Sequence, residues 1–143
     1  MDEWEQRSHV VLLARKWLGL PYRDGARLRG ICGDCTFLAL VYEDAGLISP
    51  VQIDPYSPQA HMHRTGSLYI NAVRERAHET QTPKMGDLVM YWFGRDFSHG
   101  AIVGDEGWPQ IIHADKAVGY IIEADGQQGQ LARAQKHLFF TMW

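Results

Sequence analysis

The sequence has few cysteines, no long apolar run and no excess of basic residues. Only 2 of the 143 residues are cysteine, which excludes the disulfide framework typical of small secreted domains. No apolar stretch approaches the ~20 residues that a membrane-spanning helix needs. The formal net charge of -3 and the pI near 6.1 give no basic patch for phosphate backbones. We therefore expect neither nucleic acid nor membrane among the partners of this protein.

The N-terminus also lacks the order of a signal peptide, a basic segment followed by an apolar one. It begins Met1-Asp2-Glu3-Trp4-Glu5, which is acidic, so we expect the protein to be made in the cytoplasm without export by the general route. What is present is an ordinary globular composition, with 45% hydrophobic and 22% charged residues. This composition and the chain length predict one domain over residues 1–143.

The first half of the chain has helical patterns and the second half has strand patterns. A capping-box spacing at Asp2 and Glu5 begins a helix that Gly19 terminates. Two more helices are expected over Thr36–Ala45 and Leu68–His78, separated by an irregular segment. That segment is Ser49–Thr65, and the strands expected after it are Leu88–Phe93, His99–Val103, Gln110–Ala114, Gly119–Glu123 and His137–Trp143. The order predicts an α+β fold, with N-terminal helices packed on a central antiparallel sheet of about five strands.

Cys35 is the candidate nucleophile because it stands at the start of a predicted helix. Gly33 and Asp34 precede it, and the apolar face of the helix follows it. The unpaired N–H groups and the positive end of the helix dipole favour a thiolate, so we expect a lowered pKa for Cys35. Asp34 is a candidate helix cap or a group that binds substrate.

Two histidines on neighbouring predicted strands are the candidate partners of this thiol. If residues 104–108 form the hairpin loop, His99 lies directly opposite His113, and both rings project from one face of the sheet. We expect the cysteine helix to pack on that face. A thiol at a helix start and two strand histidines are the components of a cysteine hydrolase, in which His99 is the base and His113 orients it.

The same residues also allow two other interpretations. Cys32-Gly33-Asp34-Cys35 has the spacing of a redox dithiol, although a charged loop precedes it instead of a buried strand. Cys32 and Cys35 with His61 and His63 have the residue types of a zinc site. The hydrolase interpretation requires neither a metal nor an organic cofactor.

The chain resembles the NlpC/P60 cysteine peptidases from about Val10 to the last predicted strand. The segment Leu20–Cys35 and the later Asp54-Pro55-Tyr56-Ser57 are most similar to the phage-encoded, tail-associated branch. The motifs that carry the resemblance are Pro21-Tyr22, Gly33-Asp34-Cys35-Thr36, Pro83-x-x-Gly86-Asp87-Leu88-Val89, Ser98-His99-Gly100-Ala101-Ile102 and Ile112-His113-Ala114. A bulky Phe37, where the family usually has a glycine, is a candidate for reshaping the substrate groove.

The resemblance implies a papain-like fold and cleavage of peptidoglycan stem peptides, in many members between D-glutamate and a diamino acid. By position it implies Cys35 as nucleophile, His99 as general base and His113 as the group that orients the base. It also implies Tyr22 and Asp34 beside the nucleophile, in oxyanion or substrate binding. Phage tail proteins are then candidate partners, and delivery by a virion or a secretion system would bring the protein to the cell wall.

Two alternatives to a peptidase follow from the same residues. One is an amidase or acyltransferase on the same papain-like scaffold. The other is a non-enzymatic tail-assembly component, against which the joint presence of Cys35, His99 and His113 argues.

Overall fold

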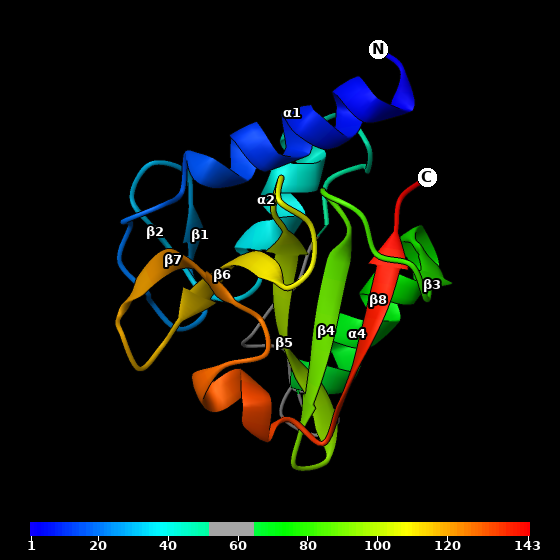
Figure 1. The fold of residues 1–143 in the computed structure, drawn as a ribbon. Helices are drawn as coiled ribbons and strands as arrows, with labels where there is room; N and C mark the ends of the chain where they lie inside the picture. The colour runs from blue at the N-terminus through cyan, green and yellow to red at the C-terminus, as the bar shows by residue number, and fades with distance from the viewer. Residues whose placement is uncertain (52–64) are drawn as a thin grey trace.

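The computed structural model describes residues 1–51 and 65–143, in which helices pack against an antiparallel sheet (Figure 1). The main sheet has the strand order β3-β8-β4-β5-β6-β7, and a two-stranded sheet joins β1 to β2. The helices are α1 (Glu3–Arg15), α2 (Phe37–Asp44), α4 (Thr65–Arg76) and the 3-10 helix η1 (Gly129–Arg133). The strands are β1 (Arg27–Leu28), β2 (Cys32–Gly33), β3 (His78–Thr80), β4 (Leu88–Phe93), β5 (Asp96–Val103), β6 (Gln110–Asp115), β7 (Tyr120–Asp125) and β8 (Lys136–Thr141).

The predicted α+β class is confirmed, and the main sheet has six strands where about five were expected. The additional strand is β3, which pairs His78 with Thr141 of β8. The predicted third helix reached His78, but α4 ends at Arg76. The three residues of β3 are polar or exposed and carry no alternating pattern. Its pairing with the edge of β8 therefore defines this strand, and such long-range pairing leaves no local signal.

The helix ends follow the expected capping residues. The Asp2 side chain accepts the N–H of Glu5 at 2.8 Å, which satisfies one of the unpaired amides at the start of α1. This helix ends at Arg15, and turns continue to Gly19, whose φ of +82° is the left-handed conformation that glycine adopts without strain. Gly46 ends α2 in the same way, with a φ of +74°.

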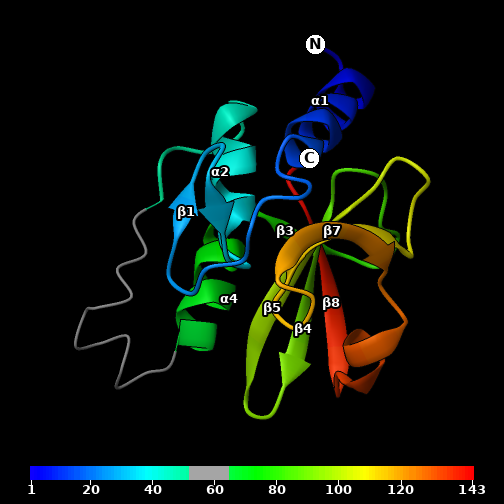
Figure 2. The same cartoon turned by 90° about the vertical axis from the view of Figure 1, so that its left-hand side faces the viewer.

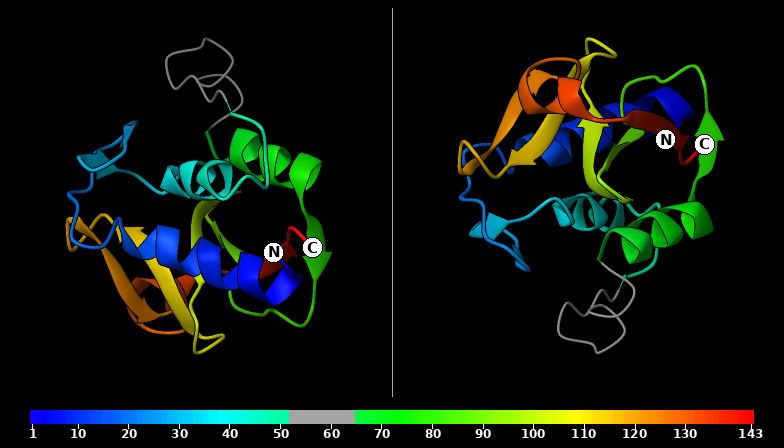
Figure 3. Two further views of the ribbon diagram at one scale, coloured as in Figure 1. Left: turned by 90° about the horizontal axis from the view of Figure 1, so that it is seen from above. Right: turned by 90° about the horizontal axis from the view of Figure 1, so that it is seen from below.

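The central strands of the sheet are buried on both faces. Leu88, Met90 and Ile102 point toward the helices, where they join the apolar residues of α1, α2 and α4. Val89 and Tyr91 point to the opposite face, where η1 contributes Leu131 to a second, smaller cluster. Figure 3 shows α2 and α4 side by side, and Figure 2 shows η1 on the other side of the sheet. Burial on both faces explains the uniformly apolar sequence of β4.

A buried ion pair connects α1 to the start of β4. The Arg7 guanidinium donates to Asp87 Oδ1 at 2.8 Å and to the Met85 carbonyl at 2.9 Å. Asp87 is 1% exposed, so it depends on this arginine for its counter-charge. Trp143 lies 4.2 Å from the Arg7 guanidinium, so the C-terminal residue also packs on α1. The Gly86-Asp87 motif therefore stabilises the fold, because Asp87 joins the start of β4 to α1 through Arg7.

The predicted irregular segment Ser49–Thr65 lies, for residues 52–64, outside the described residues. In the part of the chain that the structure describes, no helix is both long and apolar enough to cross a membrane.

Candidate active site

Cys35 lies in the short connection between β2 and α2. Its backbone carbonyl accepts the Tyr69 hydroxyl of α4 at 2.7 Å, which fixes the position of this residue against the next helix. Its thiol donates to the Ser98 carbonyl of β5 at 3.6 Å. The sulfur is thus directed at Ser98, the residue that precedes His99 on β5. Cys35 and His99 are more than 60 positions apart in the sequence, and the fold brings them together.

The Asp34 carboxylate stabilises the same connection between β2 and α2. Its Oδ1 accepts the N–H of Thr36 at 2.8 Å and also the Thr36 hydroxyl, while Oδ2 accepts the N–H of Gly25 at 2.9 Å. Both carboxylate oxygens are therefore engaged within the loop that presents Cys35. Asp34 is therefore not the cap of α2, because the N-cap is Thr36 and no side chain caps this helix end. Asp34 also does not line the cleft around Cys35.

His99 and His113 meet directly, as predicted. The His99 Nε2 and His113 Nδ1 atoms are 2.8 Å apart, and the two rings are nearly perpendicular, at 86°. One of the two nitrogens donates to the other at this distance. Because Nε2 of His99 is engaged, Nδ1 is the ring nitrogen that remains to take a proton from Cys35.

The predicted register of this hairpin is wrong by two residues. Ile102 pairs with Ile112 and Val103 pairs with Ile111, so a continued register places His113 opposite Ala101 instead of His99. The loop is displaced by one residue from 104–108 to 105–109, because the N–H of Gly104 donates to the Gln110 carbonyl at 2.9 Å. A shift of two residues preserves the face on which each side chain lies, so the two imidazoles still share one side of the sheet.

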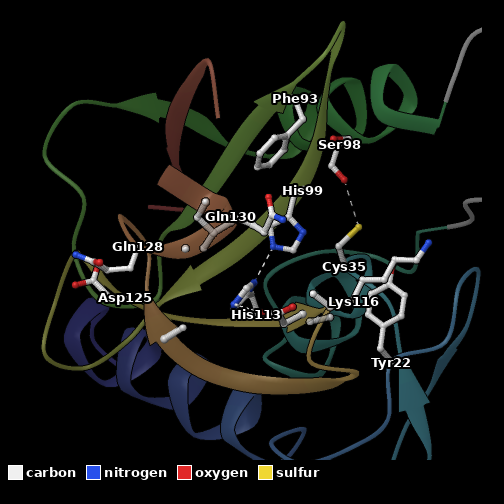
Figure 4. Close-up of a pocket in the computed structure, with 16 residues that line it drawn as sticks. Tyr22, Cys35, Phe93, Ser98, His99, His113, Lys116, Asp125, Gln128 and Gln130 are labelled. Atoms are coloured by element: carbon white, nitrogen blue, oxygen red, sulfur yellow. Dashed lines mark hydrogen bonds and ion pairs between the residues drawn. The ribbon is translucent and has the colours of Figure 1, made fainter. Parts of the chain in front are cut away.

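The expectation that the cysteine helix packs on the histidine face is also wrong. His99 and His113 share the alternation of Ala101 and Ile111, which belong to the cluster on the face opposite the helices. The helix α2 packs on the other face of the sheet. Cys35 lies just before the N-terminal end of this helix and reaches the histidines from there. Figure 4 shows the His99 ring between Cys35 and His113 in this arrangement.

These groups line an open cleft of about 630 Å³. Its walls come from the start of α2, the β4–β5 hairpin, the β6–β7 hairpin and η1 (Figure 4). The cleft is mostly apolar, with polar groups that converge on the thiol, as in many ligand-binding sites. The lining residues include Tyr22, Cys35, Ser98, His99, His113, Asp115, Lys116, Asp125 and Gln128.

The pKa of Cys35 is raised to about 12, which is opposite to the sequence-based prediction. Burial of the thiol is the main cause, and the negative charge of Asp34 adds to it. The helix begins at Phe37, whose N–H already donates to the Asp34 carbonyl, so Cys35 lies ahead of the first helical turn. The Asp34 carboxylate also offsets the positive end of the helix dipole. The resting nucleophile is therefore a thiol.

Both histidines are neutral at rest. Burial, with a smaller effect from the neighbouring His113, lowers the pKa of His99 to about 3, while Asp115 acts in the opposite direction. Burial also lowers the pKa of His113, which is 4% exposed. A neutral imidazole beside a protonated thiol is the arrangement for general-base activation of the nucleophile, as opposed to a preformed thiolate–imidazolium pair.

Asp115 is a residue of the site that sequence reasoning missed. It is two positions after His113 on β6, so it lies on the same face of the strand, and its Oδ2 is 3.9 Å from His113 Nε2. The other carboxylate oxygen accepts the N–H of Val118 at 3.1 Å in the β6–β7 turn. The i, i+2 spacing from His113 was the available signal.

Tyr22 lies in the cleft, as predicted, but Phe37 does not. The Tyr22 backbone N–H donates to the Gly119 carbonyl at 2.8 Å, which places the residue between the β1–β2 segment and β7. Burial raises the pKa of its phenol, with a smaller contribution from Cys35, so the hydroxyl is a hydrogen-bond donor at neutral pH. Phe37 is fully buried and its ring packs 5.4 Å from that of Trp17, so it supports the core instead of shaping the groove.

The redox and zinc interpretations stay predictions. Cys32 and Cys35 are both free thiols, and Cys32 is buried on the two-residue strand β2. His61 and His63 lie outside the described residues. Over residues 1–51 and 65–143, no group of three or more His, Cys, Asp or Glu side chains is placed to hold a metal ion.

Comparison with known proteins gives likeness of structure alone. No family model and no curated protein matches the sequence. The solved structures that superpose on the chain include three NlpC/P60 proteins. A lipoprotein-like protein of the NLP/P60 family from Staphylococcus aureus has a TM-score of 0.65 at 20% identity, over 96% of this chain and 42% of that one. The NlpC/p60 domain of the peptidoglycan hydrolase SagA has a TM-score of 0.59 at 20% identity, over 95% of this chain and 98% of that one.

The third is an NlpC/P60 family protein from Bacillus cereus, with a TM-score of 0.62 at 19% identity, over 92% of this chain and 39% of that one. This chain therefore spans less than half of the S. aureus and B. cereus proteins, and almost all of the SagA domain. Its fold is the papain-like fold of NlpC/P60 domains.

Proposed function

We propose that this protein is a cysteine endopeptidase that hydrolyses stem peptides of bacterial peptidoglycan. The observation that carries the proposal is the meeting of Cys35 with the His99–His113 pair in one open cleft. Thiol, base and orienting group come from three separate parts of the chain, and the fold brings them together. The solved SagA domain, which shares this fold, belongs to a peptidoglycan hydrolase, and this supports the choice of substrate.

The reaction begins with transfer of the Cys35 proton to Nδ1 of His99. The thiolate attacks the scissile carbonyl and forms a C–S bond, and the carbonyl electron pair moves to oxygen. The Cys35 N–H and the Tyr22 hydroxyl are the donors proposed for this oxyanion. His99 then gives its proton to the leaving amine as the C–N bond breaks, and water hydrolyses the thioester.

The proposed bond is the one between D-glutamate and the diamino acid of the stem peptide. This choice and the site of action rest on the resemblance of the sequence motifs to NlpC/P60 peptidases. On the same basis we propose synthesis in the cytoplasm and action at the cell wall, with a phage tail as the means of delivery.

The test is digestion of purified peptidoglycan, with the released fragments identified by mass spectrometry. Wild type is expected to release stem-peptide fragments, and Cys35→Ala to release none. Cys32→Ala is the matched control, because it removes the buried thiol outside the cleft and is expected to retain cleavage. The fragment masses identify the bond. Absence of release by folded wild type contradicts the proposal and favours another amide substrate or an assembly role.

A further inference from the structure

We propose that Asp115 is a positioning residue that sets the tautomers of both histidines, so that His99 presents a bare nitrogen to the thiol. This inference rests on the proposed function, because it assigns His99 as the base for Cys35. It concerns the contact between Asp115 Oδ2 and His113 Nε2, at 3.9 Å, and the 2.8 Å contact between the two imidazoles.

Two arrangements of protons satisfy the contact between the neutral imidazoles. In the first, His99 Nε2–H donates to His113 Nδ1, which leaves Nδ1 of His99 bare. In the second, His113 Nδ1–H donates to His99 Nε2, and Nδ1 of His99 carries the hydrogen. Only the first arrangement allows His99 to accept the proton of Cys35.

The carboxylate of Asp115 selects the first arrangement. At 3.9 Å the carboxylate acts on His113 Nε2 through its negative charge, which attracts the hydrogen of an Nε2–H group and repels the lone pair of a bare Nε2. Once His113 carries its hydrogen on Nε2, its Nδ1 is an acceptor, and His99 must donate from Nε2. The charge of Asp115 thus fixes the tautomer of His113, which in turn fixes the tautomer of His99 and leaves its Nδ1 bare.

The local structure holds Asp115 in this position. Oδ1 is occupied by the Val118 N–H at 3.1 Å, and the Asp115 carbonyl accepts the Gly119 N–H at 2.7 Å. These bonds leave Oδ2 directed at His113, which is 4% exposed and lies beside it on β6. The carboxylate also favours the positive charge that the rings acquire when Cys35 is deprotonated, because it raises the pKa of both histidines against the effect of burial.

The simpler alternative is that Asp115 only forms the β6–β7 turn. Asp115→Asn separates the two roles, because the asparagine oxygen still accepts the Val118 N–H while its NH₂ group replaces the oxygen that faces His113. That donor favours a lone pair on His113 Nε2, and therefore the second arrangement. Asp125→Asn is the matched control, since Asp125 also lines the cleft and accepts a turn amide, that of Gln127 at 2.8 Å.

The experiment is ¹⁵N NMR of histidine-labelled protein at pH 7, which distinguishes the imidazole tautomers without any substrate. Signals of the two residues are assigned with His99→Gln and His113→Gln. Wild type and Asp125→Asn are expected to hold both rings as Nε2–H tautomers, and Asp115→Asn is expected to shift both toward Nδ1–H. Alkylation of Cys35 by iodoacetamide should then slow about tenfold or more in Asp115→Asn, as the thiol loses its base.

Nδ1–H tautomers in the wild type, or Nε2–H tautomers that persist in folded Asp115→Asn, overturn the proposal. If Asp115→Asn does not fold, the wild-type tautomers and those of Asp115→Glu, which keeps the carboxylate, decide the question. Because this readout needs no cell wall, a tautomer shift in a protein that fails to cleave peptidoglycan refutes the proposed function and leaves the role of Asp115 in setting the tautomers standing.

Discussion

Acidification is expected to destabilise this protein through His99, and the size of the effect follows from burial of the ring. The pKa of His99 is about 3 in the folded state, against an ordinary value of about 6.5. Between these values the unfolded chain binds a proton that the folded chain does not, so stability falls as pH falls. One such histidine lowers the free energy of unfolding by about 2 kcal/mol between pH 7 and pH 5.

The assay compares wild type with His99→Gln, whose side chain does not titrate. Urea unfolding at pH 7, 6 and 5 is followed by the fluorescence of the five tryptophans. Subtracting the free energy of unfolding of His99→Gln from that of wild type at each pH removes the contribution of the titratable groups that both proteins contain. Wild type is expected to lose about 2 kcal/mol relative to His99→Gln over this range. Gln128→Ala, an exposed cleft residue without a titratable group, is the control and should differ from wild type by a constant amount.

The opposite result refutes the reasoning. If His99 rested as an imidazolium paired with a Cys35 thiolate, its folded pKa would lie above the ordinary value. Its contribution to stability would then be fully present at low pH and would fade as pH rises through the folded pKa. A stability difference that is flat from pH 7 to pH 5, or that favours wild type more strongly at pH 5, therefore excludes the neutral resting state.

Three further outcomes are expected. His113→Ala should slow release of stem peptides less than His99→Ala, by about tenfold, because it removes the orienting group and keeps the base; equal losses would contradict these roles. Arg7→Met should lower the free energy of unfolding by about 3–5 kcal/mol in urea denaturation at pH 7, since it leaves Asp87 buried without its counter-charge, and a loss below about 1 kcal/mol would contradict this. Gly126→Ala should cost about 1–3 kcal/mol in the same assay, because its Cβ would lie 2.6 Å from the Trp108 ring and 2.7 Å from the Tyr91 hydroxyl, and an unchanged midpoint would contradict this close approach.

The local features of the site were predictable from sequence. The start of α2 follows from the apolar spacing after Asp34, and the continuous apolar run of Leu88–Phe93 coincides with β4. The shared face of His99 and His113 was also predictable, even though the register was not. Alternation has a period of two, so a register error of two residues leaves each side chain on its predicted face.

Long-range contacts account for what the sequence did not show. The strand β3 exists through its pairing with β8, and Phe37 is removed from the groove by packing on Trp17. Each depends on a segment distant in the chain, so neither leaves a periodic signal near its own position.

The protonation states of Cys35 and His99 show most clearly the difference between what neighbouring residues determine and what long-range contacts determine. The sequence alone determined which groups stand at the start of a helix and on the strands, because capping and alternation are properties of neighbouring residues. The sequence predicted a thiolate at Cys35, because a helix dipole depends only on the residues near the start of the helix. Only the tertiary structure decided that Cys35 and His99 rest neutral, because the burial that dominates their pKa values comes from the walls of the whole cleft.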